Sequence, residues 1–326
     1  MNFLFLHIVC PSESRMARVC CYRVRSGDNL NRTGPTKTVL IIAWIVTALV
    51  ASPARASELT PETTAAFDRY IRLTEERMKD DLRDNHFLYI DRLPEERRAK
   101  IAAEMQRGEF FIERLHTLEN GQPIHIPGGA IHHWIGIAFI PHATFSQTLK
   151  VLQDYAKYQE IYKPDIRKSK LLESDGKKSK IYFQLYKKSV VSVVLNANFD
   201  ADTRLISKTR GETWSDSTRV AEVRNPGEPD EHELPVGQDH GYLWRLNSYW
   251  RIEEKDGGVY LQVESAALTR TVPAIFGWIV HNLSRSVVTN LLNSTVKAVN
   301  DRGDSASASP GNAILLNGVF QTAWRR

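Results

Sequence analysis

The chain has 326 residues, a formal net charge of +5 and three cysteines, all within the first 21 positions. Seven of its 43 Lys and Arg residues but only two of its 38 Asp and Glu residues precede Ser57, so 36 of each remain after that position. A chain beginning at Ser57 is therefore neutral and free of cysteine. This excludes disulfides and a thiol nucleophile, and it removes the basic field that nucleic-acid binding requires.

Residues 37–56 have the three parts of a signal peptide. Lys37 precedes twelve uncharged residues, 39–50, and Ala54-Arg55-Ala56 provides a small-x-small exit. A membrane-spanning helix needs about 20 apolar residues, which is more than this run offers. We therefore expect an exported protein, periplasmic or secreted, cleaved after Ala56. The alternative is a protein anchored by an uncleaved segment over residues 39–51.

Residues 57–130 are expected to form a mainly helical N-terminal extension. Thr60 suits an N-cap and Pro61 the first helical position of a helix that runs to about Leu82. A second helix is predicted between Pro94 and Gly108. A strand over Phe110–Leu118 and a turn at Asn120-Gly121 follow.

From Ile131 onwards strands dominate. After a strand at His132–Ile140 and a helix at Thr144–Tyr158, strands are predicted near Ile166–Leu172, Lys180–Lys187, Val190–Phe199, Leu205–Arg210, Arg219–Val223, Tyr242–Glu253 and Val259–Thr269. A long amphipathic helix is predicted from Pro273 to Ala298, with Phe276, Ile279, Leu283, Val287 and Leu291 as its apolar stripe. Residues 300–326 are expected to be a disordered or weakly ordered tail, within which the sequence does not place the apolar residues 314–324.

This order of elements predicts an α+β helix-grip domain over residues 131–299. A curved antiparallel sheet of six to seven strands would wrap around the long C-terminal helix, because the helix can bury its stripe only against the concave face of such a sheet. Helix and sheet would then enclose an interior space.

The sequence resembles the helix-grip superfamily of START-like, Bet v 1-like and polyketide-cyclase-like proteins (SRPBCC). The resemblance covers about Ile131 to Ala298. It is carried by the segment Leu149–Tyr155, then Tyr158, Tyr162, Pro164 and Ser169–Leu172, and by the hairpin Leu243–Glu264 with the helix from Ala274. What the resemblance implies is an internal cavity for a lipid or another apolar small molecule. It implies no cofactor and transfers no catalytic motif to this sequence.

Four histidines, His125, His132, His133 and His142, lie within eighteen positions. Adjacent residues of a strand point to opposite faces, and no HExxH, CxxC or carboxylate frame accompanies them. No metal site is therefore predicted. We expect one of His132 and His133 to face the core with a hydrogen-bond partner and the other to face solvent.

His133, Arg245, Arg251 and Glu264 are the candidate ligand-binding residues. An Arg–Glu pair inside the cavity could hold the polar head of a ligand, whereas the same side chains turned outward would form an ordinary cross-strand ion pair. The outward orientation is favoured, because Trp244 and Trp250 on the opposite face indicate the packed side.

Three functions remain open. The first is an exported carrier or binding protein for a hydrophobic small molecule or lipid. The second is an enzyme of the same fold, cyclase-like or hydrolase-like, with His133 and Glu264 as candidate catalytic groups. The third is an envelope interaction protein that docks through residues 58–130. The predicted strands near Ile181 and Val193 are apolar on both faces, which indicates cover by the N-terminal helices or a membrane or partner surface.

Overall fold

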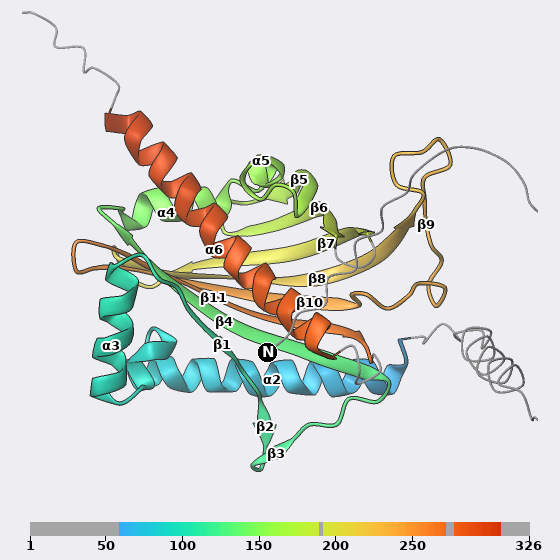
Figure 1. Ribbon diagram of the computed structural model, residues 1–326, viewed down its shortest axis with the longest axis horizontal. Coiled ribbons are helices and arrows are strands. Elements are labelled where there is room, and N and C mark those ends of the chain that lie inside the picture. Colours follow the sequence, from blue (N-terminus) through green and yellow to red (C-terminus); the bar gives the residue numbers. More distant parts are fainter. Residues whose placement is uncertain (1–58, 189–191, 272–276, 308–326) are drawn as a thin grey trace, which may run out of the picture. The chain divides into compact units, whose positions relative to one another are not determined.

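The computed structural model describes residues 59–188, 192–271 and 277–307 (Figure 1). The predicted signal peptide and the apolar residues 314–324 lie outside the described residues. In the described part of the chain, no helix combines the length and the apolar character needed to cross a membrane.

The N-terminal extension contains the two predicted helices, which are confirmed. Helix α2 is Pro61–Arg83 and α3 is Glu95–Gln106, with a short 3-10 helix, η1, at Tyr89–Arg92 between them. The Thr60 hydroxyl accepts the N–H of Thr63 at 3.2 Å, which satisfies one of the unpaired donors at the start of α2. The predicted strand at Phe110–Leu118 is broken into two pieces. The short strands here are β1 (Phe111–Arg114), β2 (Leu118–Glu119) and β3 (Gln122–Pro123).

One antiparallel sheet of nine strands forms the body of the protein. Its order is β1-β4-β11-β10-β8-β7-β6-β5, and β9 pairs with β8. Seven of these strands form the predicted curved sheet, and β1 extends it beyond β4. The remaining bounds are β4 Gly129–Pro141, β5 Ile166–Ser174, β6 Lys178–Lys188, β7 Ser192–Leu205, β8 Arg210–Arg224, β9 His232–Glu233, β10 Arg245–Lys255 and β11 Gly258–Arg270.

The predicted strand at Leu205–Arg210 is wrong. Leu205 ends β7 and Arg210 begins β8, and residues 206–209 form the turn between them, where the N–H groups of Ile206 and Ser207 both donate to the carbonyl of Arg210. Leu205 and Ile206 are apolar yet exposed, so their apolar character does not indicate a further packed strand. The predicted strand at Arg219–Val223 is only the final part of the long strand β8.

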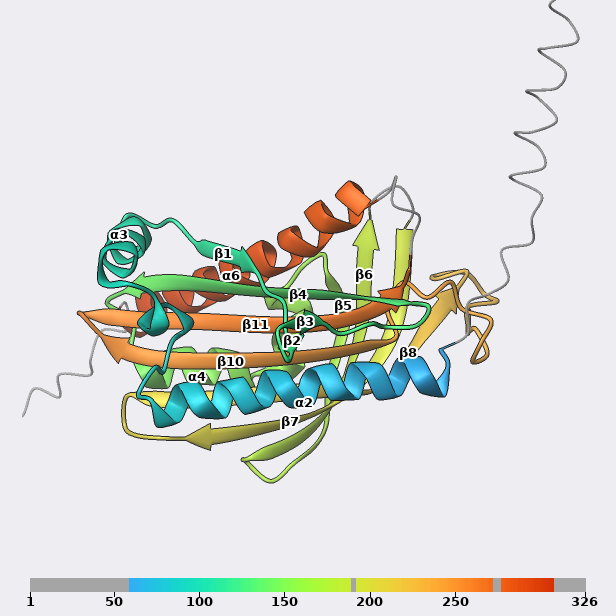
Figure 2. The ribbon, with the colours of Figure 1, turned by 90° about the horizontal axis from the view of Figure 1, so that it is seen from below.

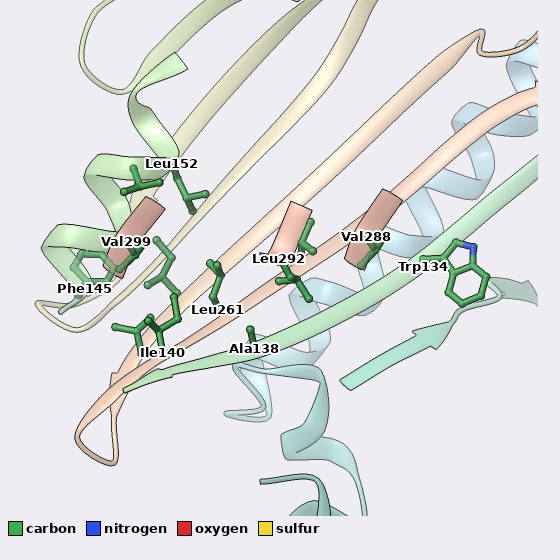
Figure 3. Packing of buried hydrophobic residues seen from close by; sticks show 13 residues of the cluster. Trp134, Ala138, Ile140, Phe145, Leu152, Leu261, Val288, Leu292 and Val299 are labelled. Atoms are coloured by element: carbon green, nitrogen blue, oxygen red, sulfur yellow. The ribbon is translucent and has the colours of Figure 1, made fainter. Parts of the chain in front are cut away.

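The concave face of the sheet is covered by helices. These are α4 (Phe145–Gln153), the 3-10 helix η2 (Tyr155–Lys157), α5 (Tyr158–Ile161) and the long C-terminal helix α6 (Gly277–Ser307). Val288, Leu292 and Val299 of α6 are buried against β4, β11 and α4, as Figure 3 shows. The buried stripe therefore lies one position beyond the predicted Val287 and Leu291. The predicted helix-grip architecture is confirmed.

Helix α6 continues nine residues past Ala298, so the predicted boundary of the tail at residue 300 is wrong. Two interactions support the extra turns. Arg302 donates to the Asp154 carboxylate at 2.6 Å, and Lys297 lies 2.5 Å from Asp301. The Ser- and Gly-rich composition from residue 301 obscured this anchor, because it indicates disorder whereas the tertiary contact favours helix.

Helix α2 lies on the convex face, so the sheet separates it from α6 (Figure 2). It buries Phe67, Tyr70, Ile71 and Met78, while α3 buries Ile101 and Met105. The extension thus uses its apolar faces to cover the sheet.

Candidate ligand-binding cavity

A cavity of about 640 Å³ lies between α6, the α4–α5 segment and the concave face of the sheet. This volume is within the range of roughly 300–1,000 Å³ that small-molecule sites occupy. Some of its lining residues are exposed and mark where it reaches solvent: Lys163, Pro164, His240, Tyr242, Asn290 and Asn293.

The floor of the cavity is a row of small side chains on neighbouring strands. Ser248 of β10 is paired with Ser265 of β11 on one side and with Ser215 of β8 on the other, and Ser215 is paired with Ala201 of β7. Trp134 and Ser265 pair at the β4 end of this row. Successive strands therefore place small residues at the same height, which leaves space above the sheet where larger side chains would fill it.

An aromatic wall stands beside this floor. Tyr155, Tyr158 and Tyr162 come from η2, α5 and the turn after α5, and Phe183 and Phe199 come from β6 and β7. The rings of Tyr158 and Phe183 stack with centroids 5.3 Å apart, and those of Tyr158 and Tyr162 meet edge to face at 4.7 Å. These separations are typical of favourable aromatic pairs.

The tyrosine hydroxyls are hydrogen-bonded within the protein. Tyr158 donates to the carbonyl of Leu152 at 2.5 Å, and the Tyr162 hydroxyl is 2.9 Å from that of Thr295 on α6. Burial raises the pKa of Tyr155 and of Tyr162 to about 12 and that of Tyr158 well above its ordinary value. All three rings therefore carry neutral hydroxyls at neutral pH.

His132 also lines the cavity, and its Nε2 is 2.9 Å from the hydroxyl of Thr269. Burial, with a smaller contribution from the charge of Arg114, lowers the His132 pKa to about 4. This imidazole is neutral at physiological pH. The expectation that one of the two adjacent histidines would face solvent is thus corrected, because α6 and the sheet curvature enclose the concave face.

Charged groups in the cavity wall are concentrated where exposed residues mark its opening. Lys187 of β6 pairs with Asp165 at 3.1 Å, and Asn290 of α6 donates to the same carboxylate at 3.2 Å. His240 is 2.7 Å from Glu222, and Arg270 lies at the end of β11. The floor and the aromatic wall are uncharged, whereas the opening is polar.

The four residues proposed from the sequence lie elsewhere. His133 and Glu264 point to the convex face, where their side chains are buried beneath α2 and 2.7 Å apart. The other imidazole nitrogen of His133 is 2.8 Å from the Tyr70 hydroxyl, and Arg77 of α2 pairs with Glu264. Burial opposes ionisation of Glu264, but the His133 hydrogen bond and the Arg77 charge outweigh it and lower its pKa.

Arg251 and Arg245 share that convex face. Arg251 is 5% exposed and donates to the carbonyls of Phe87 and Met78 at 2.9 and 3.1 Å, while Arg245 lies 3.5 Å from Asp68. The outward orientation favoured from the sequence is therefore the one that these side chains adopt, and Arg251 lies 3.7 Å from Glu212 on the neighbouring strand β8. A third layer, the N-terminal extension, covers these side chains, and Glu264 pairs with α2 rather than with the neighbouring strand.

Among the described residues, no group of three or more His, Cys, Asp or Glu side chains is placed to hold a metal ion. His132 and His133 point to opposite faces, as alternation along a strand requires. His125 and His142 are exposed loop residues.

No family model matches this sequence, and no curated protein matches it. The fold is similar to three solved structures. They are a STAR-related lipid transfer protein fragment from Xanthomonas axonopodis (13% identity, 58% of this chain and 98% of that chain, TM-score 0.39), the Zhui aromatase/cyclase from Streptomyces sp. R1128 (13%, 54% and 98%, 0.38) and human STARD10 (8%, 66% and 84%, 0.39). At these values the likeness concerns the fold alone. START-like proteins and aromatase/cyclases, the groups that the sequence resembles, are thus among its structural neighbours, and the order of its strands and helices is that of a helix-grip fold.

Proposed function

We propose that this protein binds a hydrophobic or amphipathic small molecule, such as a lipid, in the cavity between α6 and the sheet. The observation that carries the proposal is the uncharged interior, where a floor of small residues is joined to an aromatic wall. Apolar surface left in contact with water is unfavourable, and a bound apolar group would remove that contact. The polar opening would accommodate the head of an amphipathic ligand.

Binding is favoured over acid–base catalysis by the state of the ionisable groups in the interior of the cavity, away from its charged opening. A general acid or base works best with a pKa near the working pH. His132, with its pKa lowered to about 4, and the three tyrosines, with their pKa values raised, are far from neutrality. His133 and Glu264, the candidate catalytic pair, lie across the sheet from the cavity, which supports the carrier function.

A filling substitution tests the proposal. Ser248→Phe would place a ring on the cavity floor, and Thr218→Phe on the exposed part of β8 is the matched control. We expect Ser248→Phe to weaken binding of a fluorescent fatty acid at least tenfold, because the floor would no longer have room for it, and Thr218→Phe to leave binding unchanged. Equal binding by both folded variants, or no binding by the parent chain, would contradict the proposal.

The bound molecule can be identified from the natively purified protein. Extraction followed by mass spectrometry is expected to recover one class of apolar molecule from the parent chain and much less of it from Ser248→Phe. Recovery of equal amounts from both would place the molecule outside the cavity.

We further propose that the carrier acts outside the cytoplasm, on the strength of the signal peptide predicted over residues 37–56. N-terminal sequencing of the protein from the producing cell is expected to begin at Ser57. A start within residues 1–36 would favour the uncleaved anchor.

A further inference from the structure

Basic residues are concentrated in one continuous part of the chain. Residues 155–188 contain ten Lys and Arg but only four Asp and Glu. The remainder of the chain after residue 56 has 26 basic and 32 acidic residues, so the segment's excess of six positive charges is balanced elsewhere. Such a separation of charge on a neutral protein creates a local positive field that attracts an anionic partner.

The fold places this segment at the end of the sheet. Strand β5 is the last strand of the order, so its outer edge pairs with no other strand among the described residues. Lys168 and Lys170 of β5 and Lys177, Lys178 and Lys180 of the adjoining turn and β6 are exposed. Three of the ten basic side chains have a carboxylate partner in the described part of the chain: Lys168 with Glu231, Lys180 with Glu173 and Lys187 with Asp165.

Two basic side chains are held against tyrosine rings. The Arg167 guanidinium carbon lies 3.7 Å from the ring centroid of Tyr186, and the Lys170 ammonium lies 5.9 Å from that of Tyr182. Both are within the range of cation–π attraction, which limits how far these charges can move. Two of the positive charges on this edge are thus held near the surface of the sheet.

Two leucines are exposed within this basic surface. Leu171 and Leu172 have exposed fractions of 43% and 51%, and the register with β6 shifts between Leu171 and Glu173. Leu172 is therefore a bulge residue without a partner on β6, and bulges commonly redirect side chains at sheet edges. Adjacent apolar and basic side chains match the two layers of a membrane surface, since the charges attract anionic head groups and the leucines enter the region below them.

The same segment forms part of the cavity wall. Lys163, Asp165, Ile166 and Lys187 line the cavity, and Lys163 is one of the exposed residues at its opening. The cavity opening is therefore beside the start of β5, the same edge strand that carries Leu171 and Leu172 further along.

We propose that strand β5 and its turn into β6 dock on an anionic lipid bilayer, with Leu171 and Leu172 inserted among the lipids. An acidic protein would satisfy the lysines but would not require the two leucines to be exposed. A bilayer satisfies both features. The docking surface does not depend on which molecule the cavity binds.

Vesicle co-sedimentation tests the proposal with the full chain. The vesicles are phosphatidylcholine alone, or phosphatidylcholine mixed with phosphatidylglycerol. We expect binding to the mixed vesicles to exceed binding to the neutral ones at least tenfold and to fall as salt is added, because each basic residue near an anionic surface contributes about fivefold. Equal binding to both kinds of vesicle would overturn the proposal.

Two pairs of variants separate charge from insertion. Lys170→Glu with Lys177→Glu is expected to reduce binding at least tenfold, whereas the matched reversal Lys100→Glu with Lys297→Glu, on exposed positions of α3 and α6, changes it less than twofold. Leu171→Ser with Leu172→Ser is expected to reduce binding about tenfold, and Leu205→Ser, at an exposed leucine at the end of β7, leaves it unchanged. Circular dichroism verifies that each variant is folded.

The outcomes are distinct. If the lysine reversal weakens binding and the leucine variant does not, the surface attracts anions without insertion and the proposal fails. If the control reversal weakens binding as much as the β5 reversal, the effect belongs to net charge and the proposal also fails. Loss of ligand from the cavity with vesicle binding intact would contradict only the carrier function.

Discussion

The two faces of the sheet differ in the side chains that they bury. On the concave face, Ser215, Ser248 and Ser265 are short, and the space above them is enclosed by aromatic rings without charge. On the convex face, Glu264 and Arg251 are 1% and 5% exposed, although charged groups are rarely buried this deeply. The face that buries these charges is covered by α2, whereas the face with the uncharged floor contains the larger cavity.

The difference follows from the partner that covers each face. Helix α2 brings Arg77 and main-chain carbonyls to the convex face, so that Glu264 and Arg251 both find hydrogen-bonding partners. Helix α6 brings Val287 and Leu291 to the cavity, side chains that need no partner and leave room for an apolar molecule. A buried polar network specifies one arrangement, whereas an apolar cavity accepts any molecule of suitable size.

Glu264→Ala should have the largest effect, because it breaks the convex network at its centre. The substitution leaves Arg77 with only the more distant carboxylate of Asp81, 3.4 Å away, and His133 without one of its two partners. Removing one member of a buried pair costs about 3–5 kcal/mol. Urea unfolding should show this loss, and Glu173→Ala, which removes an exposed partner of Lys180, should cost less than about 1 kcal/mol. Similar losses for the two variants would show that the convex network contributes little.

Gly136→Val tests the concave face where helix and sheet are closest. A Cβ atom at Gly136 would lie 2.5 Å from Val288 Cγ1 and 2.8 Å from Leu292 Cδ1. Overpacking of this kind costs about 1–3 kcal/mol. Adding Val288→Ala should restore part of that stability in thermal unfolding, since the two positions share one space. If the double variant is less stable than either single one, α6 does not contact β4 at this point.

The cavity could be expected from the sequence only in outline. The order of strands and helices predicts a curved sheet around α6, and therefore an interior. The residues that create the space, Ser215, Ser248 and Ser265, are unremarkable strand residues until the register aligns them across three strands. Register depends on pairing between distant segments, which hydrophobic alternation within one strand does not reveal.

The convex face shows a second limit of the sequence. Alternation correctly places Arg245 and Arg251 on the face opposite Trp250, but the covering layer comes from residues about 170 positions earlier. Arg77 of α2 follows ordinary helical periodicity, so nothing local marks it as the partner of Glu264. A signal was nevertheless present in the helix itself, whose buried face includes Thr63, Thr74 and Asp81, polar residues that need partners on another element.

The dependence of stability on pH should reveal the contribution of His132, which lies on the concave face. Its folded pKa, about 4, lies below the ordinary value of 6.5, so the folded state binds this proton more weakly than the unfolded state does. Its contribution to stability is therefore complete above pH 6.5 and is lost as the pH falls towards 4. A pKa shift corresponds to about 1.36 kcal/mol per unit. We expect only part of the full value, a loss of about 1–2 kcal/mol, because the side chain borders the cavity.

The measurement is the difference between the parent chain and His132→Gln across this range. Asp216 is present in both proteins, so its contribution to the pH dependence cancels in this difference. Burial and the charge of Glu75 raise its pKa to about 6, so that its contribution acts in the opposite direction. His240→Gln alters an exposed histidine paired with Glu222 and serves as the control. If the dependence of stability on pH persists in His132→Gln, it arises from groups outside the cavity wall.

The smallest effect is expected for a substitution at Tyr162, which combines an apolar ring in the cavity wall with a buried hydrogen bond. Its ring belongs to the aromatic wall, and its hydroxyl is hydrogen-bonded to Thr295 of α6 in a buried position. Tyr162→Phe should cost about 1 kcal/mol, the usual net value of such a bond, because the Thr295 hydroxyl keeps its bond to the Leu291 carbonyl at 2.7 Å. Tyr162→Phe with Thr295→Val should cost more, because that second bond is then lost as well. Chemical denaturation measures both. Because the ring is retained, ligand affinity should be unchanged in Tyr162→Phe, and a loss of affinity would mean that the hydroxyl, rather than the ring, faces the bound molecule.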